Sequence, residues 1–236
     1  MTESKQFVAT SEAKGKAKQL RLFAMLAWIL AIGGQIFAIL KLINNEMLIW
    51  LIVAIVVILA LSITGSQLWK KANRLDPASE KERTKFFIQN QLGAIMAVLS
   101  FLPLVILLLT NKELDKKTKG IAGGVAVVAM LIAGIAGVDF DPPSIEKYTE
   151  QINAQTDVIR ELNNGVDHVY WTNHGNKYHL YSDCQHIRNR EQNEGTVKEA
   201  WEERKIGDSE LCLTCKGRAE RNRLNESAEE TIGVEE

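Results

Sequence analysis

Charge is absent from four long stretches of this 236-residue chain, and cysteine and proline are scarce throughout it. Three cysteines leave one thiol unpaired in any disulfide scheme, which disfavours a disulfide framework. The formal net charge is −1, so the chain as a whole gives no electrostatic argument for binding nucleic acid.

Motifs for catalysis and for charge movement are also missing. None of the four histidines belongs to an HExxH helix or an H-x-E pair, which would supply a general base beside a metal. The four long apolar stretches contain no charged residue. Pumps and proton-coupled transporters use ionisable residues within the membrane to carry or balance charge. We therefore expect neither an enzyme nor a pump.

The uncharged stretches predict an α-helical membrane protein. They run over residues 22–40, 47–69, 86–111 and 120–138. At about 1.5 Å per residue, each can cross a hydrocarbon core of about 30 Å. We expect a four-helix transmembrane domain over residues 21–140, with helices at about 22–43, 47–69, 87–110 and 120–138.

The distribution of Lys and Arg predicts the orientation, because cytoplasmic flanks carry an excess of them. Five precede the first span and six follow the second, whereas the first loop carries only Lys41. The third loop carries four, which weakens the signal. We expect a multi-pass protein of the bacterial inner membrane with cytoplasmic N- and C-termini. The polar leader (1–20) and the acidic tail (221–236) are expected to be disordered.

An amphipathic linker helix is expected over residues 144–164. Apolar residues recur there at steps of three and four, with Gln155 as a polar member of the series. The stripe covers less than three heptads. Two interpretations stay open, namely packing on the neighbouring domain and self-association. The fourth span offers another contact for a homo-oligomer, because Gly120 and Gly124 form a GxxxG pattern.

A small α+β domain is expected over residues 166–220. The aromatic and β-branched run VYWTNHGNKYHLY from Val169 predicts a β-hairpin. Thr196 and Glu199 form a capping-box pattern that predicts a short helix. The CLTC stretch (212–215) predicts a metal-binding knuckle, with Gly217 permitting a tight turn after it.

His179, Cys184, Cys212 and Cys215 are the expected metal ligands. Zn²⁺ prefers four tetrahedral ligands, and two cysteines separated by two residues supply two of them from one turn. His186 competes with His179 for the fourth position. A redox pair is disfavoured, because no βαβ unit surrounds the CxxC motif. Four protein ligands leave no position for water, so the site is expected to be structural.

The sequences VYWTNHGNKYHLYSDCQHI, TVKEAWEE and ELCLTCKGR together resemble the Ada-type metal-binding domain in its short, appended form. The resemblance covers Val169 to Arg218 and leaves the membrane region unassigned. It implies a zinc site. The repair domain of that family has a methyl-accepting cysteine where this chain has His179, so methyl transfer is not implied.

We expect a non-enzymatic adaptor or sensor that is anchored in the membrane and binds a cytoplasmic protein through its zinc domain. One alternative is an oligomeric channel or membrane-perturbing effector with a polar lining from Gln35 and Ser66. A weaker alternative is a redox or metal sensor. Nucleic acid is not the expected partner, because glutamates alternate with the arginines around the knuckle.

Overall fold

Two compact units make up the chain. In the computed structural model, residues 6–204 and 210–232 are described. The first unit is the helical bundle, Ser11–Pro143, and the second, here called the C-terminal unit, joins Ser144–Glu236 with Met1–Thr10. The chain therefore passes between the units twice, once before Ser11 and once after Pro143.

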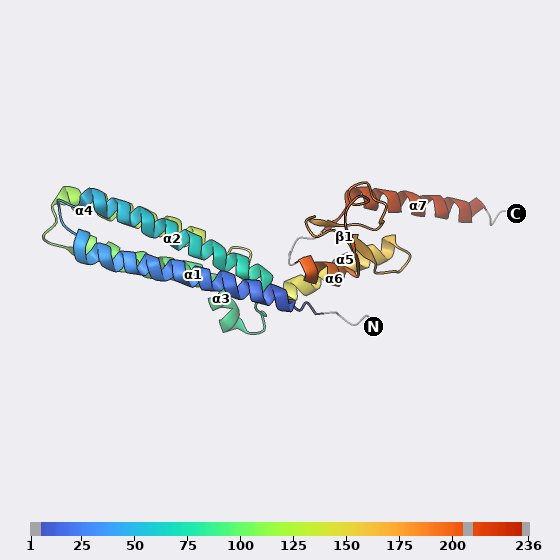
Figure 1. The fold of residues 1–236 in the computed structure, drawn as a ribbon, viewed down its shortest axis with the longest axis horizontal. Coiled ribbons are helices and arrows are strands. Elements are labelled where there is room, and N and C mark those ends of the chain that lie inside the picture. Colours follow the sequence, from blue (N-terminus) through green and yellow to red (C-terminus); the bar gives the residue numbers. More distant parts are fainter. Residues whose placement is uncertain (1–5, 205–209, 233–236) are drawn as a thin grey trace. The chain divides into compact units, whose positions relative to one another are not determined.

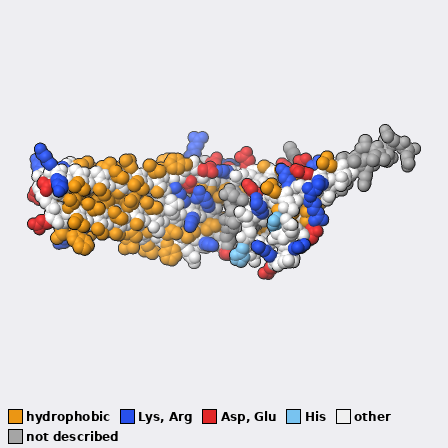
Figure 2. All heavy atoms as spheres, turned by 90° about the horizontal axis from the view of Figure 1, so that it is seen from above, with side chains coloured by type: hydrophobic (Ala, Val, Ile, Leu, Met, Phe, Trp, Pro, Cys, Tyr) orange, Lys and Arg blue, Asp and Glu red, His pale blue; other side chains and the backbone are white. Residues whose placement is uncertain are grey.

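The helical bundle consists of four long helices that lie side by side (Figure 1). They are α1 (Ser11–Phe37), α2 (Leu48–Leu75), α3 (Arg83–Thr110) and α4 (Lys116–Gly137), and a π-helical turn, η1 (Ala38–Leu42), extends α1. All four are long and apolar enough to cross a membrane, as the sequence predicts. Hydrophobic side chains cover much of the face of the bundle that Figure 2 shows, which suits contact with lipid.

Small residues let the helices approach closely. A Cβ atom built on Gly137 of α4 would come within 2.5 Å of the backbone of Gly93 in α3. Ser66 of α2 lies against the same point of α3, because a Cβ atom built on Gly93 would be 2.8 Å from the Gly137 carbonyl oxygen and 3.0 Å from the Ser66 hydroxyl. Gly93 therefore fixes the separation of three helices, as small residues do in membrane bundles.

The structure corrects the expectation for the leader and the tail. Residues 11–20 belong to α1, and Phe7 is buried in the C-terminal unit with 5% of its surface exposed. Residues 221–232 belong to α7 (Leu213–Ile232). Residues 1–5 and 233–236 lie outside the described part of the chain. Helix-forming residues such as Ala and Lys before the first apolar run allow α1 to begin ahead of the membrane segment.

The expected linker helix is α5 (Ile145–Leu162), with Ser144 as its N-cap. The Ser144 hydroxyl accepts a hydrogen bond of 2.9 Å from the backbone N–H of Lys147. The apolar stripe is buried within the C-terminal unit, with Ile152 and Ile159 each no more than 1% exposed. Packing on the neighbouring domain therefore occupies this stripe, and self-association through residues 145–162 would require it to separate from that domain.

The expected hairpin is only partly formed. The strands are β1 (Val169–Trp171), β2 (Lys177–Tyr178), β3 (Asn193–Gly195) and β4 (Glu210–Leu211). β1 pairs with β3 antiparallel and β2 pairs with β4 in parallel, while a single bridge between Tyr170 and His179 joins the two halves of the predicted hairpin. The predicted strands exist, but each finds its main partner further along the chain.

The helices after the strands follow the predicted caps with one exception. The capping box at the start of α6 (Val197–Arg204) is confirmed, because the backbone N–H of Thr196 donates to the Glu199 carboxylate at 2.7 Å and the N–H of Glu199 to the Thr196 hydroxyl at 3.2 Å. Gly217 does not form the predicted turn. It lies within α7, so the turn at the knuckle is the start of a helix.

Candidate metal centre

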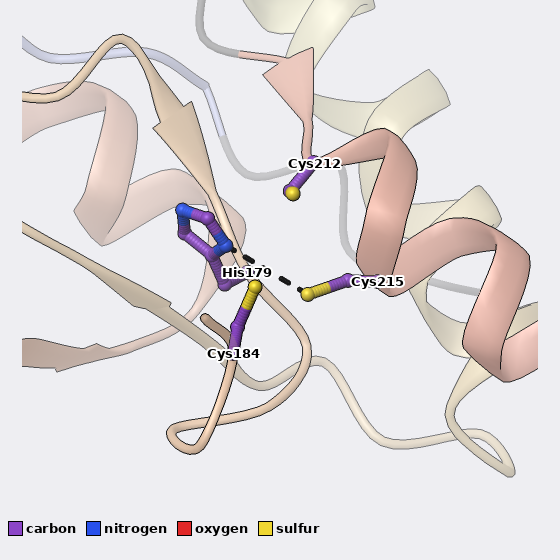
Figure 3. A group of neighbouring side chains, drawn as sticks. All are labelled: His179, Cys184, Cys212 and Cys215. Atoms are coloured by element: carbon purple, nitrogen blue, oxygen red, sulfur yellow. Dashed lines mark hydrogen bonds between the residues drawn. The ribbon is translucent and has the colours of Figure 1, made fainter. Parts of the chain in front are cut away.

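Four side chains from three segments meet at one point of the C-terminal unit (Figure 3). His179 follows β2, and Cys184 lies in the turn after it. Cys212 follows β4 directly, and Cys215 lies in the first turn of α7. The parallel pairing of β2 with β4 brings the two halves of the group together, since the backbone N–H of Cys212 donates to the Tyr178 carbonyl at 2.9 Å.

The four potential ligand atoms are buried and close together. Each of the four residues is no more than 6% exposed. One ring nitrogen of His179 and the three sulfur atoms all lie within 4.8 Å of one another. Nδ1 of His179 is 3.7 Å from Sγ of Cys215. The group can therefore hold a metal ion, and it consists of the four residues expected from the sequence.

Cys212 directly precedes α7, and the backbone N–H groups in the first turn of a helix have no partner within that helix. Burial raises the pKa of this thiol, but hydrogen bonds from the backbone N–H groups of Cys215 and Thr214 outweigh burial and lower it overall. Helix N-termini stabilise thiolates in this way. Cys212 is therefore the thiol of this pair that ionises first.

The Cys215 thiol is in the opposite situation. Burial raises its pKa to about 12, although the backbone N–H groups of Leu180 and Tyr181 donate to its sulfur. The neighbouring sulfur of Cys184 raises the pKa further. If Cys184 and Cys215 are to ionise beside the Cys212 thiolate, a positive charge must compensate the three thiolates. A bound cation would supply that charge.

One distance in the group matches the spacing of ligands around a tetrahedral metal ion. With metal–sulfur and metal–nitrogen distances of about 2.3 and 2.0 Å, tetrahedral ligand atoms lie about 3.5–3.8 Å apart. The 3.7 Å between His179 and Cys215 agrees with this spacing. Three sulfur atoms and one imidazole nitrogen are also a donor set typical of structural metal sites.

Arg218 holds the two halves of the site together from outside. Its guanidinium donates two hydrogen bonds, of 2.8 and 3.0 Å, to the carboxylate of Asp183. It also lies over the ring of Tyr181, 4.1 Å from the ring centroid. This contact ties α7 to the turn that carries Cys184. The contact could not be predicted from the sequence, in which Arg218 lies three residues after Cys215 and Asp183 is distant.

The remaining histidines lie outside the group. Nε2 of His186 is 3.2 Å from the Thr214 hydroxyl, and the His186 ring is 6.3 Å from that of His179, centroid to centroid. His168 lies near Glu194, with 3.6 Å between Nε2 and the carboxylate, and His174 is exposed in the loop between β1 and β2. The structure therefore brings His179 rather than His186 to the three cysteines.

A pocket of about 520 Å³ opens beside the metal centre. Cys212 and His179 form part of its wall. Besides these two residues, the lining contains Lys177, His186 and Arg190, and no described lining residue is an aspartate or a glutamate. Leu213 adds an apolar side chain that is 76% exposed.

The C-terminal unit contains a partly buried polar link that the sequence did not reveal. The side-chain carbonyl oxygen of Gln155 in α5 accepts hydrogen bonds from the Tyr178 hydroxyl at 2.8 Å and from Nε1 of Trp201 at 2.9 Å. Gln155 thereby connects α5 to β2, the strand that leads to His179, and to α6. The sequence marked Gln155 only as a polar position in an apolar stripe.

Comparisons of the chain with protein-family models, with curated proteins and with solved structures found no match. The conclusions about this protein therefore depend on its own residues and their geometry.

Proposed function

We propose that this protein is a membrane-anchored adaptor or sensor without enzymatic activity, in which a zinc-stabilised unit binds a cytoplasmic protein. The observation that carries the proposal is the buried group of His179, Cys184, Cys212 and Cys215 in a chain with four membrane-spanning helices. Four protein ligands fill the coordination shell of a tetrahedral ion, so the metal stabilises the fold and leaves no position for substrate.

Zinc is the metal that this donor set favours. Three thiolates and one imidazole in tetrahedral geometry are typical of structural zinc sites. The resemblance of Val169 to Arg218 to the Ada-type domain supports the same ion. His179 takes the place of the methyl-accepting cysteine, so the zinc in this chain has no reactive thiolate at that position.

The partner that the chemistry of the pocket favours is an acidic protein segment. Arg190 gives the pocket a positive charge, Lys177 adds a second one that is shared with Glu210 through an ion pair of 3.2 Å, and Leu213 offers an apolar contact at the edge. A carboxylate-bearing peptide would complement both features. The Lys and Arg residues that flank the spans support a cytoplasmic position for this unit in the bacterial inner membrane.

We also propose that the protein forms a homo-oligomer through contacts between α4 helices. A Cβ atom on Gly120 or Gly124 would meet nothing within 4 Å, so both glycines lie on an open face of the helix. The alternative of a channel lined by Gln35 and Ser66 has less support, because both side chains are buried inside a single bundle. A dye-leak assay in liposomes distinguishes a channel from an adaptor.

The test is crosslinking in cells followed by purification in detergent, with two charge-reversal variants. Lys177→Glu/Arg190→Glu reverses the charge of the pocket, whereas Arg188→Glu changes an exposed arginine outside the pocket lining. We expect an acidic protein to be recovered with the wild type and with Arg188→Glu, but not with the double variant. Recovery of nucleic acid would replace the proposed partner class. Recovery of the protein alone would overturn the adaptor function.

A further inference from the structure

The segment that precedes α1 is bound to the C-terminal unit by side chains from distant parts of the chain. The ring of Phe7 meets that of Tyr148 in α5 edge to face, with 5.1 Å between the ring centroids. The backbone N–H of Phe7 donates to the Thr149 hydroxyl at 2.9 Å, and the N–H of Val8 donates to the Glu202 carboxylate at 3.2 Å. Phe7 and Val8, here called the strap, are therefore held by both apolar and polar contacts.

The residues that receive the Phe7 ring belong to the core of the C-terminal unit. Tyr148 is 6% exposed, and Trp201 of α6 is 1% exposed. The rings of Tyr148 and Trp201 are 5.8 Å apart, centroid to centroid, and also lie edge to face. Phe7 thus adds a third ring to an aromatic cluster, and burial of its side chain stabilises the packed state of α5 and α6. The binding site for the strap exists only while these two helices are packed together.

The aromatic cluster is also connected to the candidate metal centre. Nε1 of Trp201 and the Tyr178 hydroxyl donate to the same oxygen of Gln155, at 2.9 and 2.8 Å. Tyr178 directly precedes His179 in the chain, and the Tyr178 carbonyl oxygen accepts a hydrogen bond from the N–H of Cys212. A continuous series of contacts therefore joins two of the four candidate ligands to the cluster that binds the strap.

The strap lies directly before the first candidate membrane span. Ala9 and Thr10 alone separate it from Ser11, where α1 begins. The chain passes between the two units at this point and again after Pro143. With the strap bound, the C-terminal unit is attached to the bundle through both connections. With the strap released, the attachment that remains is the one that follows α4.

We propose that the strap is a metal-dependent tether, which is bound to the Tyr148–Trp201 cluster when the centre holds a metal ion and is released when the ion leaves. The inference rests on the metal-binding role proposed for the centre and not on the proposed protein partner. A unit of this size gains part of its stability from its metal, so loss of the ion weakens the packing of α5 and α6 that forms the strap's site. Because linkage is reciprocal, binding of Phe7 in turn strengthens metal binding.

The test is hydrogen exchange of the full-length protein in detergent, followed by mass spectrometry, with the protein loaded with Zn²⁺ or stripped of it by a chelator. We expect a peptide that covers the strap to exchange about tenfold faster after Zn²⁺ removal, because the N–H groups of Phe7 and Val8 lose their acceptors. Peptides around the fully buried Leu104 of α3 are the internal control and should exchange equally in both states.

Two results of this experiment would overturn the tether, and they have different meanings for the metal centre. Equal exchange of the strap with and without bound Zn²⁺ would overturn the tether alone. Absence of Zn²⁺ binding in the wild-type protein would overturn both the tether and the proposed metal centre.

Zn²⁺ affinity, measured by competition with a chromophoric chelator, gives the reciprocal reading. Phe7→Ala removes the ring that contacts Tyr148, and we expect it to weaken Zn²⁺ binding severalfold. Val8→Ala is the matched control, because the Val8 side chain is 56% exposed, and it should leave the affinity unchanged. Equal affinities of these two variants would contradict the coupling.

A milder variant keeps the proposal testable if Phe7→Ala does not fold. Thr149→Val removes the hydroxyl that accepts from the Phe7 N–H and keeps a side chain of similar size in α5. We expect the strap of this variant to exchange severalfold faster than that of the wild type while both proteins hold Zn²⁺. Unchanged exchange would show that Thr149 does not hold the strap and would contradict the tether.

Discussion

Nδ1 of His179 lies 3.7 Å from Sγ of Cys215, although 36 residues separate them in the chain. The distance is that expected between two ligands of one tetrahedral metal ion. It arises because β2 and β4 pair in parallel and deliver His179 and the CxxC motif to the same point.

Removal of the metal should unfold the C-terminal unit and leave the bundle folded. Cys212→Ser leaves a site of three ligands, and a unit of this size depends on its metal for part of its stability. We expect one bound metal ion per wild-type chain, measured by elemental analysis, and none in Cys212→Ser. Loss of Trp171 and Trp201 burial, followed by fluorescence, should accompany metal loss. Unchanged spectra in a metal-free protein would contradict a structural role.

His179 and His186 should differ as ligands. We expect His179→Ala to lower metal affinity strongly, because it removes one of four ligands, and His186→Ala to have little effect, because that ring contacts Thr214 instead. Competition with a chromophoric chelator measures both affinities. A larger loss in His186→Ala would assign the fourth position to His186.

Gln155→Leu should destabilise the C-terminal unit. The substitution leaves the Tyr178 hydroxyl and the Trp201 indole without their shared acceptor. A buried donor without a partner costs about 1–3 kcal/mol. Denaturant unfolding of the C-terminal unit measures the change, and Ala154→Ser on the exposed side of α5 is the control. Equal stability of the two variants would show that other groups or water satisfy these donors.

Gly93→Ala and Gly137→Ala should destabilise the bundle. Each adds a methyl group within 2.5–3.1 Å of atoms of a neighbouring helix. Overpacking of this kind costs about 1–3 kcal/mol. Thermal unfolding in detergent measures the loss. Gly120→Ala and Gly124→Ala are matched controls, because their methyl groups meet nothing within 4 Å; these two should instead weaken the proposed homo-oligomer, measured by crosslinking.

Asp115 should make the start of α4 sensitive to acid. Hydrogen bonding from the backbone N–H of Thr118 lowers the pKa of this carboxyl. A lowered folded-state pKa stabilises the fold above the unfolded-state pKa of about 4, and the contribution is lost as the pH falls through the folded-state value. Asp115→Asn retains a capping side chain but cannot titrate. We expect the difference in melting temperature between wild type and this variant to change below about pH 4, and a constant difference would contradict the assignment.

The sequence by itself determined the two-part organisation and the candidate ligands. Uncharged stretches long enough to span a bilayer have few other folded solutions, so the four helices follow from hydropathy alone. Cysteine is so scarce that Cys184, Cys212 and Cys215 were the only thiols from which a site could be built. The capping signals at Ser144 and Thr196 are local, and both helices begin where these residues predict.

Only the tertiary structure decided which distant segments pair and what the polar residues do. The local pattern predicted a simple hairpin, but β1 pairs with β3 and β2 with β4, because strand pairing depends on tertiary context that a local pattern does not contain. The same limit applies to Gln155, whose two donors come from β2 and α6. Among the described residues, Gln35, Ser62 and Ser100 each have a buried side-chain atom without a hydrogen-bond partner, which the sequence could not reveal because neighbouring helices decide whether a buried polar group is satisfied.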